Sequence, residues 1–277
     1  MTPDEYCQQK AAGSGSSFYY SFLFLPAERR RAITALYAYC REVDDIVDEG
    51  LDAQVAAPKL AWWRAEVANL AAGNPLHPVT KALLPLKQKY RIEEKQLLEI
   101  IDGMEMDLTQ SRYLDWTGLE RYCYRVAGVV GLLAAGIFGY RDARTLDYAK
   151  NLGIAFQLTN IIRDVGEDAR NNRIYLPMED LKRFGVTAAD ILQGRQTPEF
   201  EQLMKFEFER ARSYYDNAFS ALPAEDRKAQ RAGLIMAAIY RTLLDEIERD
   251  GFRVLTQRIS LTPLRKFWIA WKTWVSA

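Results

Sequence analysis

The sequence predicts an all-α fold in a single domain spanning residues 1–277, on three observations. Apolar residues recur at i, i+3 and i+4 along most of the chain, as they do on one face of a helix. The alternation of apolar and polar residues that marks a strand is scarce. Prolines fall mainly where one periodic segment gives way to the next, at Pro26, Pro58, Pro75, Pro78, Pro177, Pro198, Pro223 and Pro263.

Helices are expected, in chain order, near residues 27–49, 55–72, 78–90, 93–114, 117–138, 141–168, 187–193, 198–220, 224–250 and 261–275. Most of them begin beside one of these prolines, and the others follow from the apolar recurrence alone. With 277 residues and 49% apolar content the chain can bury a substantial core, and no linker composition divides it.

The helix expected at 27–49 ends in an acidic cluster. Asp44 and Asp48 lie four residues apart, and because a helix turns about 100° per residue they share one face, with Arg41 near it one turn earlier. Like charges at this spacing destabilise a bare helix by roughly a few tenths of a kcal/mol, so a bound cation would account for the pair. A solvated surface pair is the alternative, although the cluster follows a strongly apolar stretch at residues 32–40.

The helix expected at 117–138 contains most of the longest nearly uncharged stretch, residues 126–140. An arginine bounds this stretch on each side, and it is shorter than the roughly 18 to 20 residues that a membrane span needs. We therefore predict a buried core helix and no membrane span. Its Gly128, Gly131 and Ala134 leave room for a neighbouring helix or for a thin hydrocarbon ligand.

The helix expected at 141–168 carries the second acidic cluster. Its polar face presents four oxygen-bearing side chains at spacings of 3, 4 and 4 residues, namely Gln157, Asn160, Asp164 and Asp168. Carboxylate and amide oxygens suit Mg²⁺, which usually binds through one or two protein carboxylates while substrate phosphates and water complete the octahedron. The two clusters together predict a shared site for a divalent metal and a diphosphate.

Composition argues against nucleic-acid binding and indicates the compartment in which the protein works. Lysine plus arginine equals aspartate plus glutamate at 37 each, so no overall basic field favours nucleic acid. Cys7, Cys40 and Cys123 are odd in number and widely spaced, which favours a reduced, cytoplasmic compartment. The amino terminus has no charged and apolar regions in the order of a signal peptide, and Asp4 and Glu5 lie there instead.

The single histidine limits the kinds of catalytic site that this chain could form. His77 lies between two prolines in an expected loop, so histidine triads, zinc sites and di-iron Glu-x-x-His sites are unsupported. No P-loop or Rossmann glycine motif is present either. Metal-assisted departure of diphosphate remains, and it would leave a carbocation that needs a dry cavity. Aromatic faces could stabilise that cation by about 0.5 to 2 kcal/mol each, unless they are plain core. The candidates are Phe18, Tyr19, Tyr20, Phe22, Tyr37 and Tyr122.

The chain resembles the squalene and phytoene synthase family, the trans-isoprenyl diphosphate synthases that join two prenyl diphosphates head to head. The resemblance covers nearly the whole length and rests on motifs that occur in order. They are Ser17-Phe18 with Tyr20, Tyr39-Cys40-Arg41 before the first acidic cluster, Tyr122-Cys123-Tyr124 followed by Val126-Ala127-Gly128, the segment from Gln157 to Asp168, and Arg173-Ile174-Tyr175-Leu176-Pro177.

This resemblance implies a single isoprenoid synthase domain, with helices surrounding a central cavity. Residues 2–7 and 103–108 are most similar to the bacterial presqualene diphosphate synthases of hopanoid pathways. Such a prenyltransferase takes two farnesyl diphosphates. The first loses diphosphate, its cation alkylates the double bond of the second, and loss of a proton closes a cyclopropane to give presqualene diphosphate.

The resemblance also implies residue roles. Asp44, Asp48, Asp164 and Asp168, assisted by Asn160, match the metal and diphosphate ligands, for two or three Mg²⁺ ions bound with substrate diphosphate. Tyr122 matches the tyrosine implicated in proton handling, with the released diphosphate as the other candidate base. The expected substrate contacts are Ser17, Phe18, Arg41, Gln157, Asn160, Arg163, Tyr175, Tyr240 and Arg258.

Several alternatives stay open from the sequence. Complete squalene synthases continue with an NADPH-dependent reduction, which is not expected here, and phytoene or dehydrosqualene synthases share the fold and ligands. A class I terpene cyclase or chain-elongating synthase would lack the Tyr122-Cys123-Tyr124 signature. A catalytically inactive, assembly-factor-like relative is disfavoured because every expected ligand is an intact aspartate or amide.

Expected partners include two molecules of farnesyl diphosphate and the downstream enzymes that process presqualene diphosphate, but no nucleic acid. In the helix expected at 261–275, Trp268 and Trp271 either pack on the domain or sit in a membrane interface. The second alternative would place a cytoplasmic protein in peripheral contact with the inner face of the membrane through its C-terminal aromatic tail.

Overall fold

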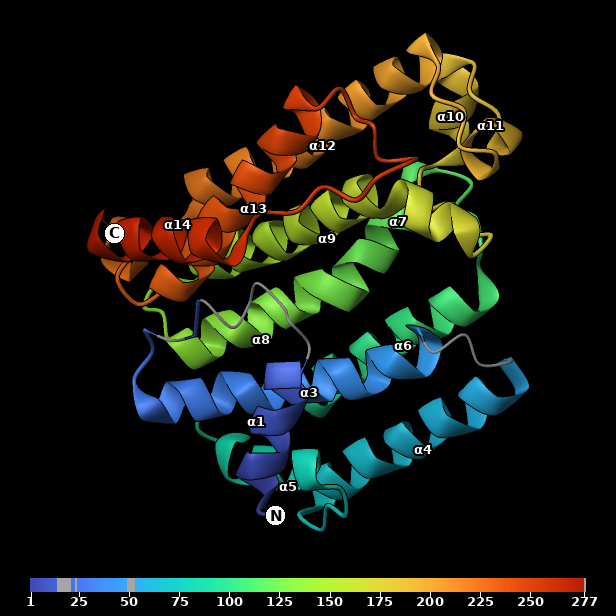
Figure 1. Ribbon diagram of the computed structural model, residues 1–277. Helices are drawn as coiled ribbons and strands as arrows, with labels where there is room; N and C mark the ends of the chain where they lie inside the picture. The colour runs from blue at the N-terminus through green and yellow to red at the C-terminus, as the bar shows by residue number, and fades with distance from the viewer. Residues whose placement is uncertain (14–20, 23, 49–52, 277) are drawn as a thin grey trace.

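The computed structural model describes residues 1–13, 21–22, 24–48 and 53–276 of the chain (Figure 1). In these residues every regular element is a helix, and a single isolated bridge pairs Arg112 with Ile174. The predicted all-α fold is therefore confirmed.

The helices follow one another along the chain with short connections. They are α1 (Pro3–Gly13), α3 (Ala27–Asp48), α4 (Ala53–Ala72), α5 (Pro78–Leu83), η1 (Leu84–Leu86), α6 (Glu94–Thr109), α7 (Trp116–Cys123), η2 (Tyr124–Gly128), α8 (Val129–Phe138), α9 (Arg144–Arg170), α10 (Met178–Phe184), α11 (Ala188–Leu192), α12 (Pro198–Ala221), η3 (Ala224–Asp226), α13 (Arg231–Arg249) and α14 (Pro263–Ser276).

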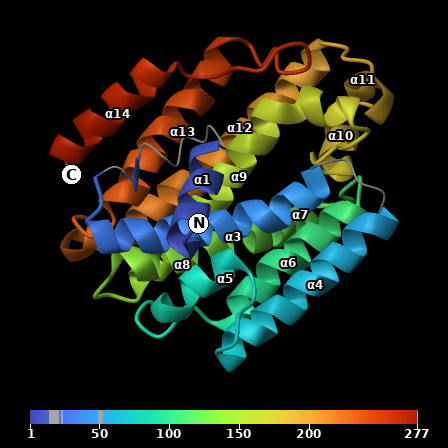
Figure 2. The same cartoon turned by 60° about the horizontal axis from the view of Figure 1, so that its bottom comes forward.

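Helix α9 lies at the centre of the molecule. Helices α12 and α13 pack on one side of it, and α8 packs on the other (Figure 1). Beyond α8 lie α3, α6 and α4, and the second view shows α1 resting against α3 and α5 (Figure 2). The buried apolar side chains form two clusters, one around α9, α12 and α13 and the other around α3 to α6, and both include residues of the α7–α8 region.

Several predicted helix boundaries are wrong, for identifiable reasons. The sequence pattern missed α1 and α10, which are short, and placed Pro58 at a boundary, whereas it lies inside α4. The segment expected at 78–90 divides at Pro85, which lacks the amide hydrogen needed to continue α5. The segment expected at 224–250 is likewise divided into η3 and α13.

The helix expected at 93–114 ends at Thr109, five residues early. Beyond it the backbone turns to meet the strip after α9, where the Ile174 amide donates to the Ser111 carbonyl at 3.1 Å and the Met178 amide donates to the Tyr113 carbonyl at 2.8 Å. This pairing satisfies backbone groups that a continued helix would have used internally.

Helices α7, η2 and α8 form one continuous helical run, Trp116–Phe138, in which η2 is a π-helical turn. By length and composition alone this run could cross a membrane, which differs from the prediction based on its shorter uncharged part. In the fold it packs between α6 and α9. A Cβ on Gly131 would lie 2.2 Å from the Ala149 carbonyl oxygen of α9, so this glycine permits close helix packing, as one of the two predicted roles requires.

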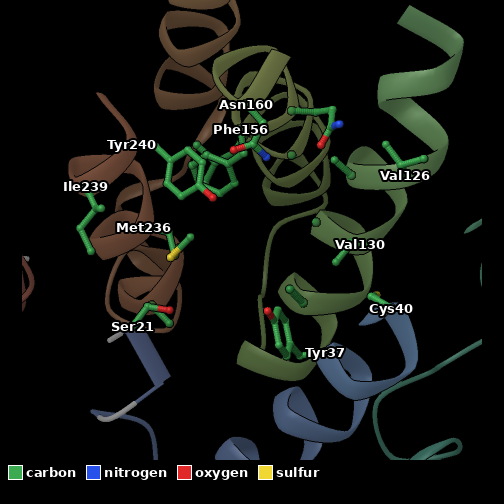
Figure 3. Close-up of a pocket in the computed structure, with 18 of the residues that line it drawn as sticks. Ser21, Tyr37, Cys40, Val126, Val130, Phe156, Asn160, Met236, Ile239 and Tyr240 are labelled. Carbon is green, nitrogen blue, oxygen red and sulfur yellow. The ribbon is translucent and has the colours of Figure 1, made fainter. Parts of the chain in front are cut away.

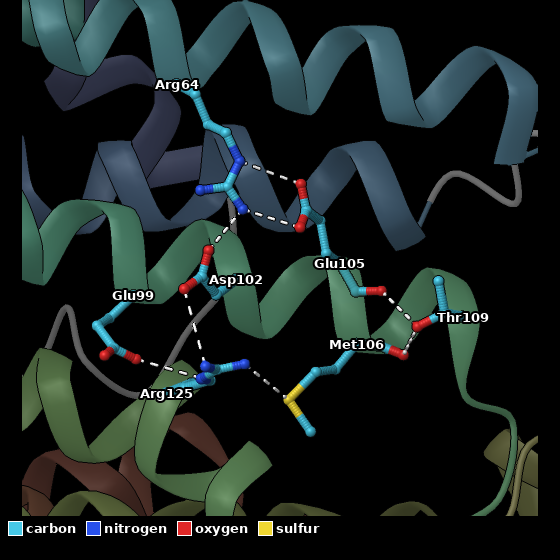
Figure 4. Close-up of polar contacts among 7 residues, drawn as sticks. All are labelled: Arg64, Glu99, Asp102, Glu105, Met106, Thr109 and Arg125. Atoms are coloured by element: carbon cyan, nitrogen blue, oxygen red, sulfur yellow. Dashed lines mark hydrogen bonds and ion pairs between the residues drawn. The ribbon is translucent and has the colours of Figure 1, made fainter.

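An ion-pair network fixes η2 from outside. Arg125 of η2 pairs with Glu99 at 3.2 Å and with Asp102 at 3.8 Å, both on α6, while Arg64 of α4 binds Asp102 and Glu105 from the other side (Figure 4). The network therefore joins α4, α6 and η2. It holds the turn that carries Val126, directly after the end of α7 that carries Tyr122, and both side chains line the central cavity.

Candidate active site

A cavity of about 490 Å³ lies between α3, α8, α9 and α13 (Figure 3). Most of its wall is apolar, with Phe156 of α9, Met236 and Ile239 of α13, and Val126 and Val130 of the run opposite. Gly131 and Ala134 of α8 contribute to this wall, and Gly131 also permits close packing against α9. The cavity is therefore suited to a hydrocarbon ligand.

The cavity has two chemically different ends. Helices α3, α9 and α13 run in one direction and α8 runs against them (Figure 1). Hence the starts of α3, α9 and α13 and the end of α8 meet at one end, which we call the floor. The opposite end, the mouth, is lined by polar side chains that were predicted from sequence: Arg41, Asp44, Tyr122, Gln157, Asn160, Arg163, Tyr240 and Arg258.

The first acidic arm, Asp44 and Asp48 of α3, is partly exposed. The Arg41 guanidinium donates to Asp44 Oδ2 at 2.7 Å and also to Asp45. Asp45 is held in addition by Lys10 of α1 at 2.8 Å. Asp48 ends α3, but its side chain lies outside the described residues, as do Ser17, Phe18, Tyr19 and Tyr20.

The second acidic arm, Asp164 and Asp168 of α9, is more deeply buried. Arg163 Nε donates to Asp164 Oδ1 at 2.8 Å, and Arg258 Nε donates to the same oxygen at 2.8 Å. Burial opposes ionisation of Asp164, but the two arginines outweigh it and hold its pKa below the usual value. Asp164 is thus an ionised carboxylate held beside the mouth by two cavity-lining arginines.

Asp168, in contrast to Asp164, holds its proton. Its burial, together with the negative charges of Asp164 and Asp107, raises its pKa to about 8. At neutral pH the metal-free second arm therefore holds a proton on Asp168, and a cation placed between the two carboxylates would displace that proton.

Asn160 offers a free acceptor at the mouth. Its Oδ1 atom is buried, yet it has no hydrogen-bond partner among the described residues. A buried carbonyl oxygen without a partner costs roughly 1 to 3 kcal/mol, so a ligand there would relieve a real penalty. This orphaned oxygen and the neighbouring carboxylates fit a hard divalent cation, although the described residues contain no cluster of three or more histidine, cysteine or acidic side chains already arranged to hold one.

Tyr122 connects the cavity wall to a buried carboxylate that the sequence analysis missed. Its hydroxyl donates to Asp107 Oδ2 at 2.9 Å, and the Tyr175 hydroxyl donates to Asp107 Oδ1 at 2.8 Å. The two tyrosine rings stack with centroids 5.4 Å apart. Tyr175, an expected substrate contact, therefore lies behind Tyr122 and helps to hold Asp107.

The protonation states in this cluster follow from burial. Burial and the charge of Asp107 raise the pKa of Tyr122 well above its usual value, so Tyr122 keeps its proton and directs it to Asp107. Asp107 sits on the apolar face of α6, at helical spacing from Ile100 and Met104, and is 9% exposed. A carboxylate on an apolar helix face was the sequence signal that could have identified it.

Aromatic side chains cover parts of the wall near the mouth. Tyr240 and Phe156 pack with ring centroids 4.8 Å apart (Figure 3). Tyr37 and Phe22 meet edge to face at 6.4 Å. Phe22, Tyr37 and Tyr122, three of the predicted aromatic candidates, line the cavity. Their placement is compatible with stabilising a cation inside it.

Sequence comparison agrees with this geometry. Residues 11–265 match the family described as squalene/phytoene synthase. The chain is 36% identical over 275 residues to the phytoene synthase of Arthrospira platensis, covering 95% of this chain and 89% of that protein. It is 35% identical over 285 residues to the 15-cis-phytoene synthase of Synechocystis sp., covering 99% and 85%.

Solved structures agree in fold. The squalene synthase HpnC from Alicyclobacillus acidocaldarius superposes with a TM-score of 0.82 at 28% identity, over 90% of this chain and 94% of that one. A dehydrosqualene synthase in complex with ligand gives a TM-score of 0.86 at 27% identity, over 99% and 96%. The predicted isoprenoid synthase fold, with helices around a central cavity, is confirmed.

Proposed function

Because the chain belongs to the squalene/phytoene synthase family, we propose that it joins two farnesyl diphosphates head to head and releases presqualene diphosphate. The supporting observation is the division of the cavity, in which carboxylates, an orphaned amide oxygen and arginines gather at one end of an apolar channel. Prenyl diphosphates have the same division, with a charged head and a hydrocarbon tail. The similarity of residues 2–7 and 103–108 to bacterial presqualene diphosphate synthases supports the C15 substrate.

The metal in this proposal is Mg²⁺, held by Asp44, Asp48, Asn160, Asp164 and Asp168 together with the substrate. When bound, it neutralises the diphosphate and so makes it a better leaving group. The arginines have a complementary task. Arg41, Arg163 and Arg258 pair with the protein's own carboxylates in the free chain, and they become available to diphosphate oxygens once those carboxylates turn to a cation.

The hydrocarbon wall supplies binding energy and excludes water. Burying a C15 tail contributes up to about 12 kcal/mol at roughly 0.8 kcal/mol per carbon, before the ordering costs are subtracted. A dry wall also protects a carbocation from capture by water. Tyr122 is a polar group on this wall that is placed to relay the proton lost on ring closure: its oxygen takes up that proton while its own proton, which already points to Asp107, passes to that carboxylate.

Phytoene synthesis from two C20 diphosphates is the second candidate. The curated relatives named phytoene synthase, at 35–36% identity, support it. Both candidates use the same head-to-head condensation, so they differ in tail length and in what becomes of the cyclopropane product.

Product analysis tests the proposal. The purified chain is incubated with Mg²⁺ and farnesyl or geranylgeranyl diphosphate, with and without NADPH, and products are identified by mass spectrometry before and after phosphatase treatment. A C30 diphosphate from farnesyl diphosphate under both conditions supports the proposal. Squalene formed only with NADPH would indicate a complete squalene synthase, C40 product alone would favour phytoene synthesis, and no condensation product would overturn all three.

We further propose that the enzyme is cytoplasmic and contacts the membrane through α14. Ala270 of α14 is fully buried and Trp274 stacks on Phe24 at 5.4 Å, whereas Leu264 and Trp268 are 84% and 60% exposed. The helix has basic residues and no acidic ones. One face thus packs on the domain, and the other has the aromatic and basic character of an interfacial helix.

Vesicle flotation tests this contact. The chain should float with vesicles rich in phosphatidylglycerol and much less with neutral ones, and Trp268→Ala should reduce the bound fraction several-fold. Trp62→Ala, which removes another exposed tryptophan far from α14 in the chain, is the control. Equal flotation of the wild type and the Trp268 variant would overturn the proposal.

A further inference from the structure

The floor of the cavity is closed by side chains from three helices and by the residue that precedes a fourth. Ile33 of α3, Phe138 of α8, Tyr148 of α9 and Gln230 beside α13 all line it. Gln230 donates through Nε2 to the carbonyl oxygen of Gly139 at 2.9 Å and more weakly to that of Ala135 at 3.3 Å. These hydrogen bonds connect the start of α13 to the end of α8, so contacts between helices hold the floor in place.

The floor is also fixed at the start of α9. Asp226 of η3 accepts hydrogen bonds from the Arg141 amide at 2.8 Å, the Asp142 amide at 3.1 Å and the Thr145 hydroxyl at 2.6 Å. Asp226 and Thr145 are both buried. Three bonds to one buried carboxylate hold the first turn of α9, and with it Tyr148 one turn later, in a defined position.

Tyr148 reaches across this end of the cavity. Its side chain is 1% exposed, and its hydroxyl has no hydrogen-bond partner among the described residues. A Cβ placed on Gly233 of α13 would lie 2.7 Å from Tyr148 Oη and 3.7 Å from Leu152. The ring therefore extends from α9 until its hydroxyl lies against α13, at a position where only glycine leaves room.

The distance from the mouth to Tyr148 is fixed by α9 itself. Tyr148 and Arg163 lie fifteen residues apart on one helix, and both line the cavity. At 1.5 Å per residue this is about 22 Å. An isoprene unit adds four main-chain bonds of about 1.5 Å, which together extend the tail by about 5 Å. One unit more or less therefore changes the tail by a large fraction of the channel's length.

We propose that Tyr148, seated on Gly233, is the stop that sets the longest prenyl tail this chain accepts. The inference rests on the proposed prenyl diphosphate chemistry, but it holds for either the C15 or the C20 substrate. A tail that fits ends against the ring, and a tail one isoprene unit longer meets it. Replacing the ring by a methyl group opens the floor toward α13, whereas a methyl group on Gly233 fills floor space or displaces the ring.

The test compares Tyr148→Ala with Tyr148→Phe and Gly233→Ala. Tail preference is measured as the ratio of kcat/KM for farnesyl, geranylgeranyl and geranylfarnesyl diphosphates. The same ratios are measured as Kd values for the unreactive thiolodiphosphate analogues with Mg²⁺, and circular dichroism checks the fold. Tyr148→Ala should shift the preference toward the next longer tail by at least about tenfold, the usual scale for discrimination in an apolar pocket.

The two other variants keep the proposal falsifiable if Tyr148→Ala fails to fold. Tyr148→Phe retains the ring and should keep the wild-type preference within about threefold, while Gly233→Ala should shift it toward the shorter tail. Unchanged ratios in Tyr148→Ala or in Gly233→Ala, or a shift in Tyr148→Phe as large as in Tyr148→Ala, would overturn the stop. Because analogue binding needs no turnover, the stop can fail while condensation persists, and condensation can fail while the stop is confirmed.

Discussion

The two acidic arms share a sequence spacing and differ in environment. On α3, Arg41 and Asp44 are 32% and 33% exposed, whereas on α9, Arg163 and Asp164 are each 17% exposed. The α9 arm also keeps one carboxylate ionised and the other protonated, with a pKa of about 8 on Asp168. The comparison teaches that one DxxxD spacing can place aspartates in different environments, and that burial and neighbouring charges, rather than the spacing, determine which carboxylates are ionised.

Removing one carboxylate from each arm gives the largest expected difference. Asp164→Asn should lower kcat by on the order of 10³-fold, because it removes a buried charge that the mouth is built to hold. Asp44→Asn on the more exposed arm should cost less, on the order of 10²-fold. Steady-state kinetics at saturating Mg²⁺ measures both, with thermal unfolding as the check on folding. Full activity in either variant would remove that arm from the site.

The next largest effect on turnover is expected for Tyr122→Phe, which changes a side chain near the buried arm of α9. It removes the hydroxyl that points to Asp107 and should slow turnover by about 10²-fold, the range of general acid–base catalysis. Binding of the unreactive farnesyl analogue should change little, because the ring remains on the wall. An unchanged rate would assign proton handling to the released diphosphate alone.

The pH dependence of metal binding distinguishes the two arms directly. The Asp168 pKa is raised to about 8, so below pH 8 a cation must displace a proton, and Mg²⁺ affinity with the unreactive analogue should fall about tenfold per pH unit. Calorimetry at pH 6, 7 and 8 measures this slope. Asp107→Asn removes a charge that raises the Asp168 pKa and should flatten the slope, whereas a pH-independent affinity in the wild type would contradict the assigned state of Asp168.

Asp168 should also make the stability of the metal-free protein depend on pH. Between the ordinary aspartate pKa and about 8 the folded chain binds more protons at Asp168 than the unfolded chain does. Its contribution to the free energy of unfolding is therefore present at low pH and is lost as the pH rises toward 8. Asp168→Asn should remove this part of the pH dependence in denaturant titrations, and an identical pH profile in the two proteins would contradict it.

The smallest effect is expected at the outer side of the exposed arm. Asp45 pairs with Lys10 and Arg41, and all three side chains are 26–32% exposed. Such partly exposed pairs contribute about 1 kcal/mol or less, so Asp45→Asn should change kcat by less than about threefold. A loss as large as that of Asp44→Asn would show that Asp45 is a ligand and that the two arms differ in composition as well as in burial.

The sequence was sufficient for the fold class, and several of the side chains expected at the site from the sequence line the mouth of the cavity. Periodicity identified the long helices, and the 3, 4, 4 spacing placed Gln157, Asn160 and Asp164 on one face of α9, where the structure brings them beside Arg163 and Arg258. Local pattern is enough here because each arm lies on a single helix.

The sequence could not supply features that depend on contacts between distant segments. Asp107 is defined by hydrogen bonds from Tyr122 and Tyr175, and the pairing of Tyr148 with Gly233 depends on how α9 and α13 pack. The end of α6 at Thr109 is likewise set by pairing with the strip after α9. Tertiary contacts, which periodicity does not encode, determined each of these.

The central claim is that the acidic arms of α3 and α9 bind one diphosphate together, and a crystal structure of the complex tests it most directly. Crystals grown with Mn²⁺ and the unreactive farnesyl thiolodiphosphate would show the metal by its anomalous signal. We predict Mn²⁺ bound between Asp44 of α3 and Asp164 of α9, with the diphosphate at the mouth and the tail directed to Tyr148. Metal bound to one arm alone, or a diphosphate held away from both, would contradict the shared site.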